Sequence, residues 1–139
     1  MENHFQAYVW KKEYETGIEE IDRQHRGLFK NIDKLLLAIY QGKEEAELYK
    51  LGKFMMDYIE EHFTQEEDWM RASNYPELEN HINEHKNFVK LYQEFKEEMD
   101  YKGPSIYLAN RMLKALRSWW EVHILKSDML YRSYVRKIL

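Results

Sequence analysis

The sequence predicts an all-α protein, folded as an up-down-up-down antiparallel four-helix bundle. Apolar residues recur at spacings of three and four along most of the chain, which is the period of an amphipathic helix. Only five glycines and two prolines occur in 139 residues, so the helices should be long and their connections short. Short connections favour antiparallel packing of neighbouring helices. A chain of this length suits one core, and we expect residues 1–139 to form a single domain.

The first helix is predicted to follow an irregular N-terminal arm. It should begin at Thr16, which has capping-box spacing to Glu19, and it should end at Gly42. A second helix should run from about residue 44 to a break near Ser73–Asn74.

The third helix is predicted to start at Pro76, a residue that suits a first helical position, and to stop at Gly103–Pro104. Ser105 can cap a fourth helix that reaches about Asp128. The short C-terminal tail, Met129 to Leu139, is predicted to form a short helix docked on the bundle.

Composition excludes several kinds of protein. The chain has no cysteine, which rules out disulfides, thiolate metal sites and a cysteine nucleophile. Its 21 basic and 25 acidic residues are interspersed, so nothing indicates a nucleic-acid partner. No apolar run approaches the roughly 18 residues of a membrane span. The N-terminus also lacks a secretory signal pattern. We therefore expect a cytoplasmic protein, and no feature of the sequence identifies a protein partner.

Seven side chains with metal-binding chemistry fall on the predicted buried faces of four helices. They are His25, His62, Glu66, His81, His85, His123 and Asp128. Residues four apart differ by about 40° around a helix, so His62 with Glu66, and likewise His81 with His85, can reach one point.

A single buried histidine is more often a hydrogen-bonded core residue than a ligand, but five of them on four helices reverse that expectation. The two acids would each cost several kcal/mol if buried without a partner, and cations remove that cost. Seven ligands suit two ions, and histidine-rich sites with an open position favour iron or manganese over zinc. His123 and Asp128 lie about 140° apart on an ideal α-helix, so we predict a π-type turn between them.

Four segments around these residues, together with YVW (Tyr8–Trp10) in the arm, resemble the hemerythrin family, most closely its stand-alone bacterial type. They are IDRQHRGLF (Ile21–Phe29), HFTQEEDWM (His62–Met70), HINEH (His81–His85) and WWEVHILKSDMLY (Trp119–Tyr131). The resemblance implies a four-helix bundle holding two non-heme iron ions, with O2 as the reversibly bound partner. It also implies a division of ligands: His81, His85 and His123 on one iron, His25 and His62 on the other, and Glu66 and Asp128 as bridges.

Other functions of such a centre remain open at this stage. They are the sensing of O2, nitric oxide or redox state, peroxide or nitric oxide turnover, and iron storage or detoxification. Beyond the ligand set no general acid, base or nucleophile is evident, so we expect a binding protein rather than an enzyme.

Five apolar residues should wall the bound O2 and exclude water: Leu28, Phe29, Phe63, Trp119 and Trp120. Trp120 departs from the family, where a smaller residue such as leucine is usual. Its indole either narrows the pocket above the metals or packs against a neighbouring helix or the arm. The sixth histidine, His4, is predicted to lie on the surface.

Overall fold

The computed structural model describes residues 10–139, and within them every regular element is helical. After a short 3₁₀ turn, η1, four long helical segments follow one another, and two of them are divided by π-helical stretches. The elements are η1 (Lys12–Tyr14), α1 (Glu19–Gln41), α2 (Glu44–Asp57), η2 (Tyr58–Phe63), α3 (Thr64–Ala72), α4 (Leu78–Lys102), α5 (Ile106–Ser118), η3 (Trp119–Ser127) and α6 (Asp128–Arg136).

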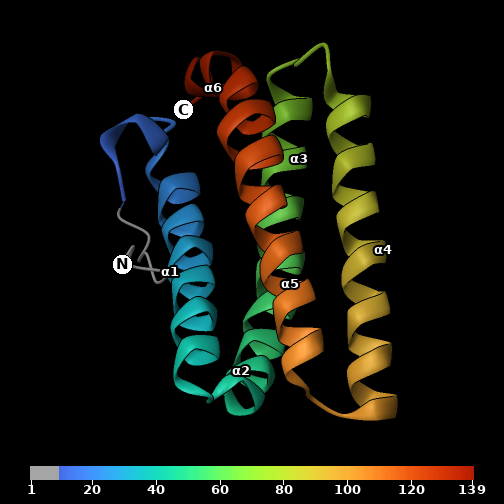
Figure 1. Ribbon diagram of the computed structural model, residues 1–139. Coiled ribbons are helices and arrows are strands. Elements are labelled where there is room, and N and C mark those ends of the chain that lie inside the picture. Colours follow the sequence, from blue (N-terminus) through green and yellow to red (C-terminus); the bar gives the residue numbers. More distant parts are fainter. Residues whose placement is uncertain (1–9) are drawn as a thin grey trace.

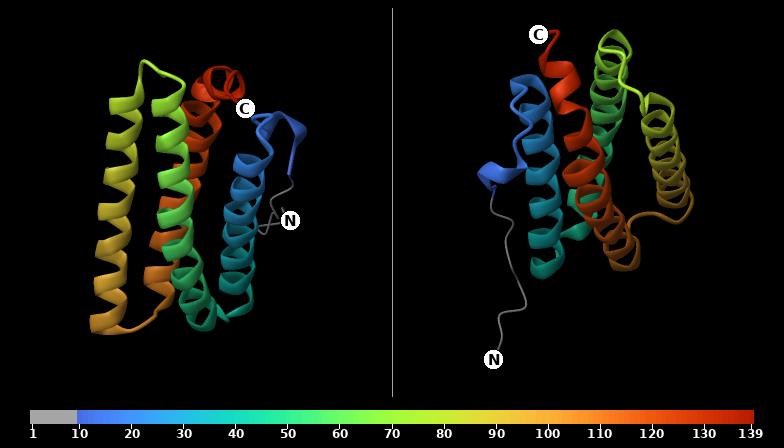
Figure 2. Two further views of the ribbon diagram at one scale, coloured as in Figure 1. Left: turned by 180° about the vertical axis from the view of Figure 1, so that it is seen from behind. Right: turned by 90° about the horizontal axis from the view of Figure 1, so that it is seen from above.

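The segments α1, α2–η2–α3, α4 and α5–η3–α6 form a four-helix bundle (Figure 1). Each segment returns along the bundle in the direction opposite to the one before it. Figure 2 shows that α1 and α4 lie on opposite sides of the bundle, and that the segment carrying η1 lies outside α1. The predicted all-α bundle is confirmed.

Most helix ends lie where the sequence places them. Gly42, with φ of 72°, terminates α1, and Gly103, with φ of 81°, terminates α4. Ser105 caps α5, since its hydroxyl oxygen accepts a hydrogen bond from the backbone N–H of Leu108 at 3.0 Å. The break after α3 falls at Ser73, as predicted. These predicted helix ends are confirmed. They could be predicted locally, because glycine adopts a backbone conformation that ends a helix and serine accepts a hydrogen bond from a nearby backbone N–H.

The prediction that Thr16 caps the first helix was wrong. Gly17 has φ of 86°, which is outside the helical region, and α1 begins at Glu19. The Thr16 backbone N–H and hydroxyl instead donate to one carboxylate oxygen of Asp22, both at 2.8 Å. The Gly17 N–H donates to the other oxygen at 3.2 Å. Asp22, one turn inside α1, therefore organises the turn that precedes the helix.

Two other boundaries differ from the prediction. Pro76 lies in the turn between α3 and α4, and α4 begins two residues later, at Leu78. The chain reverses direction between α3 and α4, and Asn74 adopts φ of 56° in this turn. Pro76 is still part of the turn, so α4 cannot begin there. The predicted tail helix is present as α6, but it follows directly on η3 without a loop.

The core has two parts. The larger cluster fills the bundle between α1, α2, α4 and α5, and a smaller one lies where α6 meets α3 and the start of α1. Tyr131 and Val135 of α6 are fully buried in the smaller cluster. Among residues 10–139 no helix combines the length and apolar character needed to cross a bilayer. The polar site lies between the two clusters.

Candidate metal centre

The structure brings all seven predicted ligand candidates together. Each is at most 2% exposed, although all are polar or charged. They come from all four long segments: His25 from α1, His62 from η2, Glu66 from α3, His81 and His85 from α4, His123 from η3 and Asp128 from α6. His62 lies near the end of η2 and Glu66 near the start of α3, His25 and the pair His81 and His85 lie within the first two turns or so of α1 and α4, and Asp128 is the first residue of α6.

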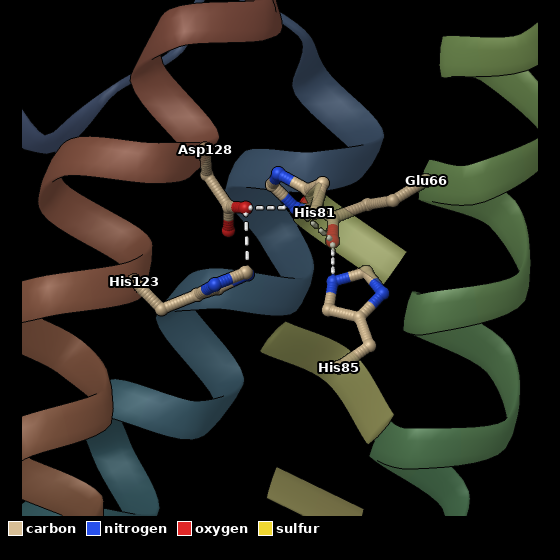
Figure 3. A group of neighbouring side chains, drawn as sticks. All are labelled: Glu66, His81, His85, His123 and Asp128. Carbon is tan, nitrogen blue, oxygen red and sulfur yellow. Dashed lines mark ion pairs between the residues drawn. The ribbon is translucent and has the colours of Figure 1, made fainter. Parts of the chain in front are cut away.

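The cluster divides into two overlapping groups, each with ligand atoms within 4.8 Å of one another. One group contains three histidines, His81, His85 and His123, and we call it the three-histidine half (Figure 3). The other contains two histidines, His25 and His62, and we call it the two-histidine half. Glu66 and Asp128 belong to both groups. They are therefore the residues placed to link two ions.

The carboxylate oxygens are divided between the two halves. Asp128 Oδ1 lies 2.9 Å from Nε2 of both His81 and His123, whereas Oδ2 lies 2.9 Å from His25 Nε2. Each oxygen of this carboxylate therefore faces a different half.

Glu66 repeats this division from the opposite side. Its Oε1 lies 3.1 Å from Nε2 of His85, and its Oε2 lies 3.3 Å from Nε2 of His62. Two carboxylates that each face both halves form the arrangement that a bridged pair of cations requires.

Helical geometry explains how each pair of candidates reaches the cluster. His62 and Glu66 are four residues apart, so they share a face of the α2–η2–α3 segment. His123 and Asp128 are five apart, and η3 is π-helical from Trp119 to Ser127. In a π-helix residues five apart lie roughly one turn from each other. The predicted π-type turn is confirmed, and it brings His123 Nε2 to Asp128.

The electrostatics of the cluster lower the pKa values of both acids and raise those of two imidazoles, His81 and His123. Burial raises the pKa of Glu66, but the surrounding imidazoles, led by His62, hold it well below its ordinary value. Burial and Glu66 likewise oppose ionisation of Asp128, yet neighbouring imidazoles, led by His123, bring its pKa below the ordinary value. Burial disfavours protonation of His81, but Asp128 and Glu66 raise its pKa to about 10. Cations can replace these protons.

His25 Nε2 is hydrogen-bonded to Asp128 Oδ2 at 2.9 Å, but the Nε2 atoms of the other four histidines lie near the two acids without forming a hydrogen bond. Within residues 10–139, eight buried side-chain polar atoms have no hydrogen-bond partner, and six of them face the interior of the cluster: His62 Nε2, Glu66 Oε1, His81 Nε2, His85 Nε2, His123 Nε2 and Asp128 Oδ1. Native proteins leave only a few such atoms unsatisfied per 100 residues, and each costs about 1–3 kcal/mol, so six of them in one cluster are unusual. Their lone pairs converge on shared points, so this donor set fits metal ions.

Aromatic rings stack on three of the histidines. Phe63 lies flat on His85 with 3.9 Å between ring centroids, and Trp119 lies on His123 at 3.8 Å. Tyr58 of η2 lies parallel to His62 at 4.8 Å. Leu28 and Phe29, the other predicted wall residues besides Trp120, are buried in the larger core cluster. These rings fix the imidazole planes and keep water from them.

The Trp120 indole lies close both to the ligand cluster and to the arm. It is 3% exposed and lies 6.3 Å from the His25 ring, beside the two-histidine half. It also makes edge contacts with Trp10 of the arm at 5.9 Å and with Tyr14 at 5.5 Å. Trp120 therefore stands between His25 and the arm. His4 and Tyr8 lie outside the described residues.

Sequence analysis missed several polar residues that hold the ligand candidates. Tyr131 is fully buried, and its hydroxyl donates to Glu66 Oε2. Three others, Gln24, Glu67 and Glu84, each contact a histidine of a neighbouring helix. The sequence did hold one indication of these three residues, because each is the immediate neighbour of a ligand candidate. Their partners, however, depend on helix packing.

Comparisons with known proteins agree with the resemblance seen in the sequence. Residues 16–135 match the family described as the hemerythrin HHE cation binding domain. The chain is 35% identical to a bacteriohemerythrin of Clostridium acetobutylicum over 131 residues, which cover 89% of this chain and 98% of the relative. It is 30% identical to a bacteriohemerythrin of Pseudomonas aeruginosa over 92% of this chain and 81% of the relative.

A myohemerythrin of Theromyzon tessulatum is 29% identical to the chain over 91% of this chain and 92% of the relative. The similarity thus extends from bacterial to animal relatives and spans the bundle with all seven candidates. The chain therefore belongs to the hemerythrin family, whose domain binds a non-heme di-iron centre.

Proposed function

We propose that the protein binds O2 reversibly, one molecule per di-iron centre, for storage or delivery. The observation that supports this most is the unequal division of donors around the two shared carboxylates. The three-histidine half offers five groups and the two-histidine half offers four. If each iron ion accepts six ligands, the two-histidine half would therefore have one more position left for O2 than the three-histidine half.

In this proposal His81, His85 and His123 would hold one iron, and His25 and His62 would hold the other. Both irons would share Glu66 and Asp128, in keeping with the division of their oxygens. A bound di-iron pair supplies the electrons that reversible O2 binding needs. Five neutral imidazoles support this better than a carboxylate-rich set, which favours further oxidation.

The residues around the ligands support binding rather than turnover. Phe63, Trp119 and Trp120 cover the imidazoles and limit the access of water. Tyr131 holds its proton firmly, since burial and the charge of Glu66 raise its pKa well above the ordinary value. Its hydroxyl donates to Glu66 and so fixes the orientation of that carboxylate. Both features suit an O2 carrier, because access of water and of exchangeable protons promotes irreversible oxidation of the metal centre.

The test is anaerobic loading with Fe²⁺, followed by exposure to air and then by removal of O2. We expect two irons per chain and a visible absorption band that forms with O2 and disappears when O2 is withdrawn. A band that does not reverse, one metal per chain, or a preference for zinc would refute the proposal. Sustained consumption of hydrogen peroxide by the loaded protein would instead favour an enzyme.

A further inference from the structure

The Nδ1 atoms of the histidines, which face away from the cluster, have different partners in the two halves. In the three-histidine half, His123 Nδ1 lies 2.7 Å from the carboxylate of Glu84. His85 Nδ1 lies 2.7 Å from the carboxylate of Glu67. Two imidazoles of this half are thus backed by acids.

Among the described residues, no acid contacts the Nδ1 atoms of the two-histidine half. His62 Nδ1 donates to the side-chain amide oxygen of Gln24, and that amide donates in turn to Gln65 at 2.9 Å. His25 Nδ1 is buried and has no hydrogen-bond partner within residues 10–139. The backing of this half is therefore neutral.

Glu84 is also held in place by a second donor. The hydroxyl of Ser127 donates at 2.8 Å to Oε1 of Glu84, the same oxygen that accepts the His123 Nδ1–H. Ser127 is the last residue of η3, so the π-helical stretch that presents His123 also presents the residue that fixes its acid. The Glu84 side chain is 38% exposed, and without this bond solvent could draw it away.

The difference between an acid and an amide behind an imidazole matters for a bound cation. A hydrogen bond to a carboxylate is roughly twice as strong as one to a neutral acceptor. It also places negative charge on the imidazole and makes Nε2 a better donor to metal. Loss of such a partner typically lowers metal affinity about 10- to 100-fold.

We propose that Glu84 and Glu67 are positioning residues that make the three-histidine half the stronger metal site and the first to fill. Gln24, in the equivalent place, keeps the two-histidine half weaker, so that its ion binds second. This inference rests on the proposed di-iron function. It adds an order in which the two metal ions bind. That order follows from the residues hydrogen-bonded to the histidines as well as from the number of ligands in each half.

The test is a stepwise titration of the metal-free protein with Co²⁺ under nitrogen, followed by ligand-field absorption. The wild-type chain should bind two ions in separable steps. E84Q and E67Q keep the size of the side chain but remove its charge, and each should weaken the first step 10- to 100-fold without changing the second. S127A keeps the Glu84 charge but releases it, and should weaken the first step less.

Q24E is the converse variant, because it places an acid behind His62. It should strengthen the second step by a similar factor and bring the two steps together, a gain that the loss of packing cannot produce. E98Q is the matched control. Glu98 also lies on α4 and pairs with Arg111 at 2.7 Å, with 25% side-chain exposure like Glu67, but far from the cluster. Both steps should be unchanged in E98Q.

The outcomes separate this inference from the proposed function. If the wild-type chain binds fewer than two Co²⁺ ions, the two-metal proposal fails. If it binds two, but E84Q, E67Q and Q24E all retain wild-type affinities, the positioning role is refuted. An equal loss in both steps, shared by E98Q, would also refute it, since it would reflect the fold. Should E84Q fail to fold, S127A and Q24E still decide the matter.

Discussion

Replacing Trp120 with leucine tests how the arm and the metal centre are joined. The indole is almost fully buried and touches Trp10, Tyr14 and Phe29, while its edge faces His25. A leucine keeps an apolar group in the core but cannot reach all of these rings. The substitution should therefore loosen the arm and open the space beside the two-histidine half.

The stability cost follows from the lost volume and contacts. Leucine is smaller than tryptophan by ~60 Å³, and at roughly 24 cal/mol per Å³ the resulting void costs about 1.5 kcal/mol. Losing the edge contacts with the three rings adds about 1 kcal/mol. For a chain of this length a loss of about 2.5 kcal/mol lowers the melting temperature by roughly 8 °C.

The kinetic consequence concerns access to His25. Azide should bind the oxidised, iron-loaded Trp120→Leu protein several-fold faster in stopped flow, and oxidation in air should be quicker, with two irons retained. Trp69→Leu is the control, since Trp69 packs in the smaller core cluster and should lose stability without a change in azide binding. An unchanged melting temperature would refute the packing argument, and unchanged azide and oxidation rates would refute the role of Trp120 as a wall.

Three other predictions concern the cluster and its support. Glu66→Ala should lose iron and be destabilised by several kcal/mol, because it leaves buried imidazoles unpaired; His4→Ala should match wild type in iron content and melting, and equal iron in both variants would contradict the ligand assignment. Loading the metal-free protein at pH 7.5 should release about two protons per chain, since pKa values of about 10 for His81 and about 9 for His123 keep both protonated beforehand. Apparent metal affinity should thus fall as pH falls, and calorimetry in buffers of different ionisation enthalpy would give the count, with a value near zero excluding this protonation. Asp22→Ala should cost about 2–4 kcal/mol by urea unfolding, because its carboxylate holds the turn before α1; a loss under 0.5 kcal/mol would show that the turn needs no such anchor.

Local sequence determined the helices and the positions that face the core. Gly42, Gly103 and Ser105 end or begin helices through their own backbone or the nearest N–H groups, so they could be recognised without tertiary contacts. Thr16 was misjudged because Asp22 competes for its hydroxyl and Gly17 leaves the helical region. The sequence shows that the Thr16 hydroxyl could cap a helix. It does not show whether that hydroxyl bonds a backbone N–H of the first turn or the carboxylate of Asp22.

The ligand candidates were also visible in the sequence, because spacing along a helix determines which side chains share a face. The same reasoning required a π-type turn between His123 and Asp128, and η3 provides it. The other π-helical stretch, η2, could not be predicted from ligand spacing, since His62 and Glu66 already have α-helical spacing. Whether the seven residues bind iron stays a prediction until metal content is measured.

Tertiary structure alone decided which side chains meet across helices. Glu84 reaches His123 from α4, Glu67 reaches His85 from α3, and Trp120 meets both the arm and His25. Sequence periodicity defines the angle of a residue around its own helix. It does not define the rotation and axial shift of one helix against another, which depend on how the whole core packs. The charge behind each histidine follows from that packing.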